Sequence, residues 1–192
     1  MILSKKVFRC EVKSQIKSLS LDYINSSNLG IFNGITLLPE FISAKRIFTY
    51  ISVDREPDTR KLIEKSFELE KVIAVPCDVL NGNMNFAILN SDVSELRLDI
   101  YGIPCPDNNA KRIAPEKGDL IIVPALCCSL DGQRLGYGGG YYDRFLADTD
   151  ALKVCLCREK LLTASLPWEN HDIPVDIIVT EENITRPRRA PC

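Results

Sequence analysis

The chain has 192 residues, of which 45% are hydrophobic and 26% are charged, and its formal net charge is −2. This composition is typical of a globular protein of one ordinary domain, and it excludes a disordered or fibrous chain. A slightly acidic protein has no overall positive field, so a nucleic-acid partner is not expected. No apolar run reaches the roughly 18 residues of a membrane span, and the first ten residues, MILSKKVFRC, lack the apolar core of a signal peptide. We therefore expect a cytoplasmic protein, monomeric and without a membrane partner.

The cysteines are unusually numerous. Disulfide frameworks belong to short exported chains, and metal sites usually show C-x-x-C pairs, which this sequence lacks. Several of them lie in apolar runs, where a thiol acts as a small hydrophobic group. We therefore expect free structural thiols at Cys10, Cys77, Cys105, Cys127, Cys128, Cys155, Cys157 and Cys192.

The first forty residues predict two helices. Residues 2–20 place apolar side chains on one face, and four basic residues recur at every fourth position on another. By itself such a basic stripe is more typical of a solvated face than of a binding site. The second predicted helix covers residues 22–38, with Asp22 as its N-cap and two internal glycines that weaken it. The basic stripe comprises Lys5, Arg9, Lys13 and Lys17.

From residue 46 onward, predicted strands alternate with predicted helices. The helices cover residues 59–70, 91–98 (capped by Ser91) and the segment that starts at YYDRFLA; Asp58 and Thr59 are suitable N-caps for the first of these. The strands cover residues 46–52, 71–76, 84–89, 119–124, 151–157 and 175–180.

This alternation predicts an α/β protein, a single three-layer domain with a mostly parallel central sheet covered by helices on both faces. The domain is expected to span residues 1–185, followed by a short basic tail at 186–192. Ligands of such sheets bind outside the carboxyl ends of the strands. The loops after Ser52, Pro76, Pro124 and Thr180 are therefore candidate site loops.

One loop, RLGYGGGYYDRFL at residues 134–146, is exceptionally rich in glycine. It matches neither a Walker A loop, because no Gly-Lys-Ser/Thr occurs, nor GxGxxG, because Tyr141 occupies the position of the third glycine. Successive glycine N–H groups can still form a concave anion site, and Asp143 follows closely enough to reach a metal held by phosphates. A flexible glycine loop beside an ordinary capped helix remains the alternative.

The stretch VPALCCSLDGQRLGYGGGYYDRFL at residues 123–146 resembles the signature of the 5-formyltetrahydrofolate cyclo-ligase family, in which VPG-L-A-F-D is followed by RLG-x-G-x-GYYDR-x-L. Weaker markers occur in the family's order, so that the resemblance covers nearly the whole chain. They are Lys5 and Arg9 near the amino terminus, Glu56 and Thr59 in REPDT, Met84 and Phe86 in NMNF, and Asp172 in ENHDIPVDIIVTEE.

The resemblance implies an enzyme that closes the formyl group of 5-formyltetrahydrofolate onto N10, giving 5,10-methenyltetrahydrofolate, while ATP becomes ADP and phosphate and Mg²⁺ is required. The formyl oxygen is a poor leaving group, so the family is thought to phosphorylate it before N10 attacks. Phosphoryl transfer asks a protein mainly for positioning and charge neutralisation. It needs no nucleophilic serine or cysteine, in agreement with the lack of any recognisable triad.

The resemblance also implies roles for individual residues. Arg134, Tyr142 and Asp143 would be catalytic, and Asp143 and Asp172 would hold the magnesium ion. The ATP site would comprise Lys5, Arg9, Arg134, Leu135, Gly136, Tyr137, Gly138, Gly139, Gly140, Tyr141 and Tyr142. The folate site would comprise Ser52, Glu56, Met84, Tyr101 and Tyr142, with Glu56 accepting hydrogen bonds from the pterin. The only histidine, His171, lies beside Asp172 and is more typical of an exposed or orienting group than of a proton donor.

The sequence departs from the family pattern at a few positions. Cys128-Ser129 replaces a frequent Phe-Asp, and these smaller groups are expected to loosen or reshape the folate side of the pocket. Cys105-Pro106 replaces a frequent Glu-Pro, and Pro57 replaces a branched aliphatic residue. Two other functions stay open at this point. One is a phosphate-binding enzyme related to sugar-phosphate isomerases or CoA-transferases, and the other is a non-catalytic homologue that binds folate or nucleotide without turnover.

Overall fold

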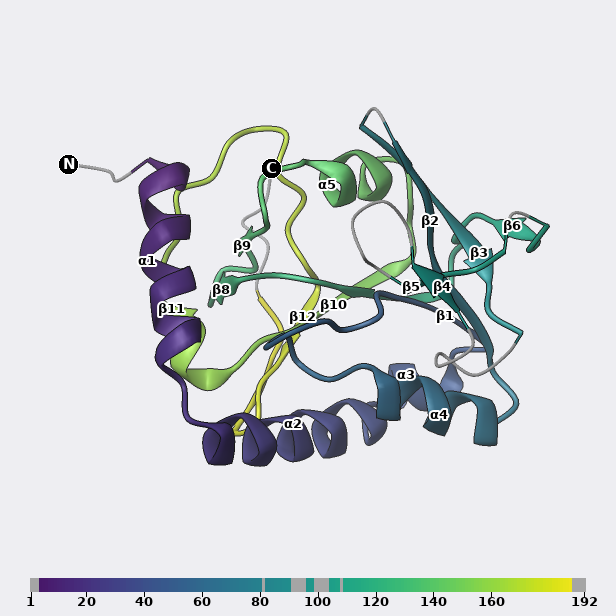
Figure 1. Ribbon diagram of the computed structural model, residues 1–192, viewed down its shortest axis with the longest axis horizontal. Helices are drawn as coiled ribbons and strands as arrows, with labels where there is room; N and C mark the ends of the chain where they lie inside the picture. Colours follow the sequence, from purple (N-terminus) through teal and green to yellow (C-terminus); the bar gives the residue numbers. More distant parts are fainter. Residues whose placement is uncertain (1–3, 81, 91–95, 99–103, 108, 188–192) are drawn as a thin grey trace.

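The computed structural model describes residues 4–80, 82–90, 96–98, 104–107 and 109–187. Within these residues, an eight-stranded sheet forms the centre of the molecule (Figure 1). Its order is β13-β12-β10-β7-β1-β2-β3-β6. The strands are β1 (Arg46–Thr49), β2 (Val72–Leu80), β3 (Asn83–Ile88), β6 (Arg112–Ile113), β7 (Leu120–Val123), β10 (Leu152–Leu156), β12 (Ile177–Val179) and β13 (Ile184–Thr185).

The middle of this sheet is parallel, and the edges are antiparallel. β12, β10, β7, β1 and β2 run in one direction, whereas β13, β3 and β6 run against their neighbours. The parallel strands are short apolar runs because both of their faces are buried. On β7, for example, Leu120 and Ile122 pack into one hydrophobic cluster while Ile121 and Val123 pack into the other. The predicted mostly parallel sheet with two covered faces is therefore confirmed.

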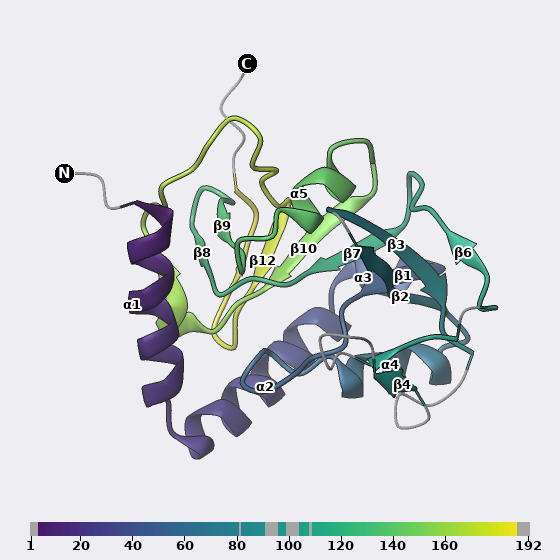
Figure 2. The same ribbon diagram turned by 45° about the horizontal axis from the view of Figure 1, so that its top comes forward.

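Helices α2 (Leu21–Thr36), α3 (Pro39–Ser43) and α4 (Arg60–Glu68) cover one face of the sheet, and α1 (Lys5–Ser18) and α5 (Tyr141–Leu146) lie on the other side (Figures 1 and 2). The second side also carries a small sheet in the order β11-β8-β9. Its strands are β11 (Leu162–Thr163), β8 (Cys127–Ser129) and β9 (Arg134–Leu135), and a 3₁₀ turn at Glu159–Leu161 precedes β11. A further hairpin pairs β4 (Arg97–Leu98) with β5 (Pro104–Cys105).

The glycines of α2 are required by packing. A Cβ on Gly30 would lie 2.7 Å from the Cβ of Glu181, and one on Gly34 would lie 3.0 Å from Val179. These contacts let the helix approach the β12 end of the sheet closely. The intrinsic cost of glycine in a helix is thus offset by burial of the neighbouring apolar residues Ile31 and Ile35.

Several local expectations need correction. Ser20, rather than Asp22, caps α2, and its hydroxyl accepts the N–H of Tyr23. Thr59 stands at the N-cap position of α4 but makes no side-chain cap, because its hydroxyl donates to the Tyr50 carbonyl. Asp58 accepts the Arg60 N–H in its place.

Two predicted segments also differ from the structure. The helix predicted at 91–98 is wrong for Arg97 and Leu98, which form strand β4, and residues 91–95 lie outside the described residues. The loop expected after Pro76 is absent because β2 continues to Leu80, where β3 pairs with it through an irregular register.

The expectation of free thiols holds for the seven cysteines that the structure describes; Cys192 lies outside this part of the chain. Across the described ranges, the helices are too short or too polar for any of them to cross a bilayer.

Candidate active site

A cavity of about 310 Å³ opens at the carboxyl ends of β1, β7 and β10. Its walls come from residues 53–57 after β1, 125–126 after β7 and 156–158 at the end of β10, with α1 on the outer side. β1 and β7 are neighbours in the sheet. The chain continues from β1 to β2 on one side of this pair, and after β7 it returns to the sheet at β10 on the other side. The cavity therefore lies where neighbouring strands send their connections in opposite directions, which is the usual ligand position in such sheets.

Glu56 is the acidic residue most enclosed by this cavity. It closes a tight turn in which its N–H donates to the Val53 carbonyl and its Oε2 accepts the Val53 N–H at 3.0 Å. The hydroxyl of Tyr137 donates to Oε1 at 2.6 Å. Burial raises the pKa of Glu56, although these two hydrogen bonds act in the opposite direction. The carboxylate is thus held by neutral donors rather than by a cation.

Arg158 lies beneath Glu56 and is 1% exposed. Its Nη2 donates to the carbonyls of Arg55 and Glu56 at 3.1 Å each, and its Nη1 donates to that of Ile24 at 3.4 Å. Burial lowers the pKa of this guanidinium. Arg158 therefore fixes the main chain that carries Glu56. This role was not predictable from the sequence, because REK resembles an exposed turn.

The basic stripe of α1 is directed toward the site along its whole length. Lys5 forms ion pairs with Asp172 at 2.5 Å and with Glu169 at 3.6 Å. Arg9 donates through Nε to the Gly136 carbonyl at 2.9 Å. The residues expected to form a merely solvated face, Lys13 and Lys17, are indeed exposed but also line the cavity. That expectation was incomplete, because helical period alone does not tell which face meets a ligand site.

The glycine loop joins β9 to α5, and its backbone requires glycine at two positions. Gly138 has φ +107° and Gly140 has φ +66°, a region that L-residues rarely adopt. Arginines occupy two of the loop's carbonyl groups: Arg9 bonds to Gly136, and Arg144 bonds to Gly139 at 2.7 Å. Among the described residues, none accepts a hydrogen bond from the N–H groups of residues 137–140. Such exposed donors suit an anionic ligand.

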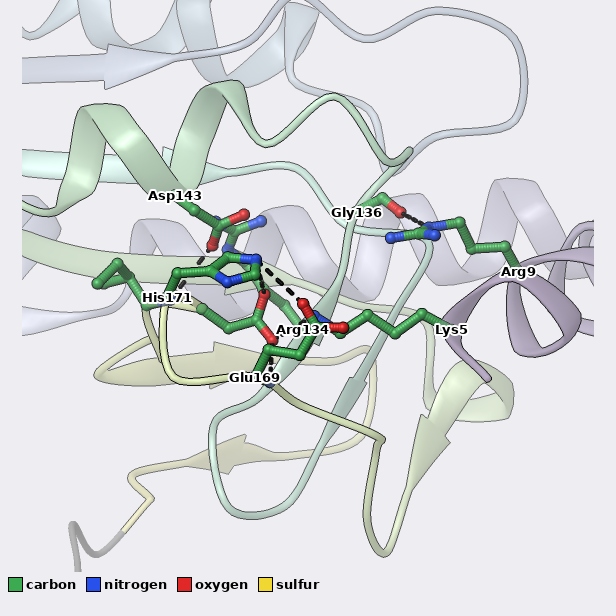
Figure 3. A network of polar contacts seen from close by, with 9 residues as sticks. Lys5, Arg9, Arg134, Gly136, Asp143, Glu169 and His171 are labelled. Atoms are coloured by element: carbon green, nitrogen blue, oxygen red, sulfur yellow. Dashed lines mark hydrogen bonds and ion pairs between the residues drawn. The ribbon is translucent and has the colours of Figure 1, made fainter. Parts of the chain in front are cut away.

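A chain of charged groups links the start of α5 to the amino-terminal helix (Figure 3). Arg134, whose side chain is 4% exposed, donates through Nη2 to Oδ1 of Asp143 at 2.7 Å. The same oxygen accepts the N–H of Ile173 at 3.2 Å. Asp172, which precedes Ile173 in the sequence, accepts a hydrogen bond from Lys5. Asp143 and Asp172 are therefore brought together from α5 and from the loop before β12.

The protonation of Asp172 is set by opposing effects. Burial of the side chain raises its pKa, but the hydrogen bond and charge of Lys5 and the N–H of Glu169 outweigh burial and leave the pKa lowered. His171 contacts Glu169 at 3.3 Å and is 68% exposed, on the solvent side of this network.

The residues at this end of the site suit a divalent cation with phosphate. Asp143 and Asp172 supply hard oxygen ligands, which Mg²⁺ prefers in combination with phosphate oxygens. Two buried polar atoms beside them, Nε of Arg134 and the hydroxyl of Tyr142, have no hydrogen-bond partner among the described residues. Buried donors without partners are costly, so they indicate a ligand that completes them. Within the described residues, no three His, Cys, Asp or Glu side chains lie close enough together to hold a metal ion without further ligands.

Other predicted residues stand apart from the cavity. The Ser52 hydroxyl is tied to Asp58 and to the Thr59 N–H, and Met84 packs beside the hydrophobic cluster under α5; neither lines the cavity. Tyr101 lies outside the described residues. Of the departures from the family pattern, Cys128 and Ser129 are fully buried in β8 behind the cavity wall. Pro57 lines the cavity, and its carbonyl accepts the Tyr50 hydroxyl at 3.0 Å.

Comparison with known proteins gives one consistent answer. Residues 2–181 match the 5-formyltetrahydrofolate cyclo-ligase family. The chain is 32% identical to the 5-formyltetrahydrofolate cyclo-ligase of Escherichia coli strain K12, over 76% of this chain and 83% of that protein. It is 26% identical to a probable 5-formyltetrahydrofolate cyclo-ligase of Schizosaccharomyces pombe, over 97% and 99%. The NMR structure of Aquifex aeolicus 5,10-methenyltetrahydrofolate synthetase is similar with a TM-score of 0.86 and 30% identity, over 99% of this chain and 96% of that one.

Proposed function

Because the chain belongs to the 5-formyltetrahydrofolate cyclo-ligase family, we propose that its site converts 5-formyltetrahydrofolate and ATP into 5,10-methenyltetrahydrofolate, ADP and phosphate. One observation carries the assignment of this site. Tyr137 belongs to the glycine loop and also lines the cavity, so the loop suited to phosphate and the pocket suited to folate share a wall. A phosphoryl donor and its acceptor must meet in this way.

The glycine loop is the proposed phosphate cradle. Its N–H groups at residues 137–140 would bind the ATP phosphates, and the unpaired Nε of Arg134 would add a charged donor. Lys5 and Arg9 would contribute positive charge from α1. This arrangement favours a reaction in which charge on transferring phosphate oxygens must be neutralised.

The proposed magnesium ligands are Asp143 and Asp172. When bound, the ion would neutralise charge on the ATP phosphates. Arg134 and Lys5 form ion pairs with these two carboxylates. The same two cations would lie close to the phosphates that the metal binds.

The proposed folate pocket is the cavity around Glu56. The carboxylate would accept N–H groups of the pterin, which would place the 5-formyl oxygen toward the glycine loop. Transfer of the γ-phosphoryl group to that oxygen makes it a phosphate leaving group. N10 then attacks the formyl carbon and the C–O bond breaks. Inorganic phosphate leaves with the former formyl oxygen, and the N10 proton passes to the phosphate or to solvent. Tyr142 does not line the cavity, but its buried hydroxyl has no partner among the described residues, and it is proposed to contact the transferring group.

The cellular and structural context completes the proposal. We propose that the protein acts in the cytoplasm as a monomer, and that residues 1–185 form one catalytic domain. The tail from residue 186 would stay outside the chemistry. Arg186, at its start, pairs with Glu40 of α3, on the face of the sheet opposite α1 and α5.

A direct assay tests the function. The purified protein is mixed with 5-formyltetrahydrofolate, ATP and Mg²⁺, and the near-ultraviolet band of the methenyl product is followed. We expect the band to grow only when ATP and Mg²⁺ are both present, with one ADP formed per product. Binding of both ligands without product would favour the non-catalytic alternative. Binding of phosphate esters but not of folate would favour the isomerase-like alternative.

A further inference from the structure

The side chain of Tyr137 serves a different ligand from the one its backbone serves. Its neighbours Gly136 and Gly138 belong to the phosphate cradle, yet the phenol ring extends away from the loop and lines the folate cavity. Its hydroxyl reaches Oε1 of Glu56, 81 positions away in sequence, at 2.6 Å. Lys13 of α1 lies 5.8 Å from the ring centroid on the other side. The ring is therefore held between α1 and the turn after β1.

The hydrogen-bond capacity of Glu56 explains what this contact does. A carboxylate has about four lone-pair sites, two on each oxygen. The Val53 N–H occupies one on Oε2, and the Tyr137 hydroxyl occupies one on Oε1. One site on each oxygen is left, and these two acceptors match two adjacent N–H donors of a pterin edge. The two protein donors, on opposite oxygens, also fix the rotation of the carboxylate.

We propose that Tyr137 is a positioning residue for folate, whose hydroxyl orients the Glu56 carboxylate toward the pterin while its backbone remains part of the nucleotide loop. This inference rests on the proposed function and refines it, because it divides one residue between the two substrates. It also means that Tyr137 connects the nucleotide loop directly to Glu56 and fixes the position of one relative to the other.

The electrostatic surroundings of Glu56 supply a signature for this role. Burial raises the pKa of Glu56, and the Tyr137 hydroxyl is the main opposing influence, ahead of the Val53 N–H. Loss of the hydroxyl would therefore raise that pKa further, since a hydrogen bond to the charged form is lost. The other charged groups on the cavity wall do not change in such a variant; they are Lys13, Lys17, Asp54, Arg55 and Arg158.

The test uses Tyr137→Phe, which keeps the ring and removes only the hydroxyl. Binding of 5-formyltetrahydrofolate is measured without nucleotide, so that phosphate contacts do not contribute. We expect the Kd for folate to rise about five- to tenfold, in the range for an ordinary net hydrogen bond, because the hydroxyl acts on folate through Glu56. The Kd for Mg-ATP should stay within twofold. The acid limb of folate binding should move to higher pH.

Tyr23→Phe is the matched control. Tyr23 also donates its hydroxyl to a glutamate, Glu181, but this pair does not line the cavity. Its folate Kd and acid limb should equal those of the wild type. Thermal unfolding of both variants checks that each is folded, and the 52% exposure of Tyr137 favours an intact fold for the first.

The outcomes separate the two proposals. If the wild type turns over folate while Tyr137→Phe retains its folate Kd and acid limb, the positioning role is refuted and the function stands. If the variant weakens Mg-ATP as much as folate, the side chain belongs to the nucleotide site and the inference is again refuted. If the wild type neither binds nor converts the folate, the proposed function itself fails, and the inference fails with it.

Discussion

The two ends of the site hold their carboxylates in opposite ways. At the proposed phosphate end, Asp143 and Asp172 are each paired with a cation, Arg134 and Lys5 respectively. At the proposed folate end, the donors to the Glu56 carboxylate among the described residues are an N–H and a phenol, and the buried cation Arg158 bonds to the main chain instead. Correspondingly, the pKa of Asp172 is lowered by its partners, whereas the pKa of Glu56 is raised by burial.

This difference indicates how each end receives its ligand. At the proposed phosphate end, Arg134 and Lys5 balance the charge of the two carboxylates, and the same cations suit the oxygens of a phosphate. A neutral heterocycle brings N–H donors but no charge. A carboxylate that is incompletely satisfied by neutral donors gains most from such a ligand, because buried acceptors are costly when left unpaired.

The largest expected effect comes from Asp143→Asn. The amide keeps an oxygen for Arg134 and for the Ile173 N–H, so the local structure should persist, but the negative charge for Mg²⁺ is lost. We expect kcat to fall about a thousandfold, equivalent to roughly 4 kcal/mol of transition-state stabilisation, while the folate Kd changes little. Steady-state assays and folate titration measure the two effects.

Asp148→Asn is the control for this prediction, because Asp148 is exposed two residues beyond α5. It should leave kcat unchanged. Near-normal activity of Asp143→Asn would show that Asp143 is not a metal ligand. The two ends would then not differ in whether a carboxylate binds a charged ligand.

Arg158→Met should have the next largest effect, and on stability rather than chemistry. The substitution removes the donor from the partly buried carbonyls of Arg55 and Glu56 and leaves the fully buried position of the guanidinium without its hydrogen bonds. We expect the free energy of unfolding to drop by about 2–4 kcal/mol, since each buried unpaired group costs roughly 1–3 kcal/mol. Urea unfolding measures this loss.

The matched comparison is Arg144→Met. Arg144 also bonds to two carbonyls, of Gly82 and Gly139, but it is exposed, so water replaces the lost donor. Its unfolding free energy should change by less than about 1 kcal/mol, as for ordinary surface sites. Equal losses in the two variants would show that burial of Arg158 is not what matters at the folate end.

Glu56→Gln addresses the folate end itself. One acceptor oxygen becomes an NH₂ donor, and the charge disappears, so the folate Kd should rise about 10- to 100-fold, the range for a hydrogen bond to a charged group. In the wild type, folate binding should weaken as the pH falls through the raised pKa of Glu56, because protonation removes the charged acceptor. This acid limb should be absent in Glu56→Gln. Folate titrations across pH test both statements, and an unchanged acid limb would assign it to another group.

The sequence was most informative where the physics is local. Continuous apolar runs such as DLIIVP predict buried parallel strands because both faces of such a strand must be covered, and β7 confirms this. The glycine-rich loop is typical of backbone that approaches a ligand or takes up positive φ, and Gly138 and Gly140 have positive φ. The order of strands and helices then places the loops after β1 and β7 at one edge, as the cavity shows.

The sequence was least informative where a side chain's partner is distant in the chain. Arg158 lies in a polar segment, and its burial depends on carbonyls from α2 and from the loop after β1. Thr59 has the right residue type for an N-cap, but the Tyr50 carbonyl takes its hydroxyl. The roles of Lys13 and Lys17 likewise follow from where the cavity lies relative to α1. The assignments of Ser52, Met84 and Tyr101 to the folate site stay predictions.

The smallest expected effect tests the outer limit of the phosphate end. His171 adjoins Asp172 in sequence, yet it is 68% exposed and contacts Glu169, itself 58% exposed, at 3.3 Å. Exposed ion pairs contribute about 0–1 kcal/mol, so His171→Asn should lower kcat less than about fivefold, with an unchanged Kd for Mg-ATP. If kcat instead fell a hundredfold and regained activity with added imidazole, His171 would transfer a proton in the reaction. Charge pairing would then be insufficient to describe the phosphate end, because a titrating group at its solvent edge would share in the chemistry.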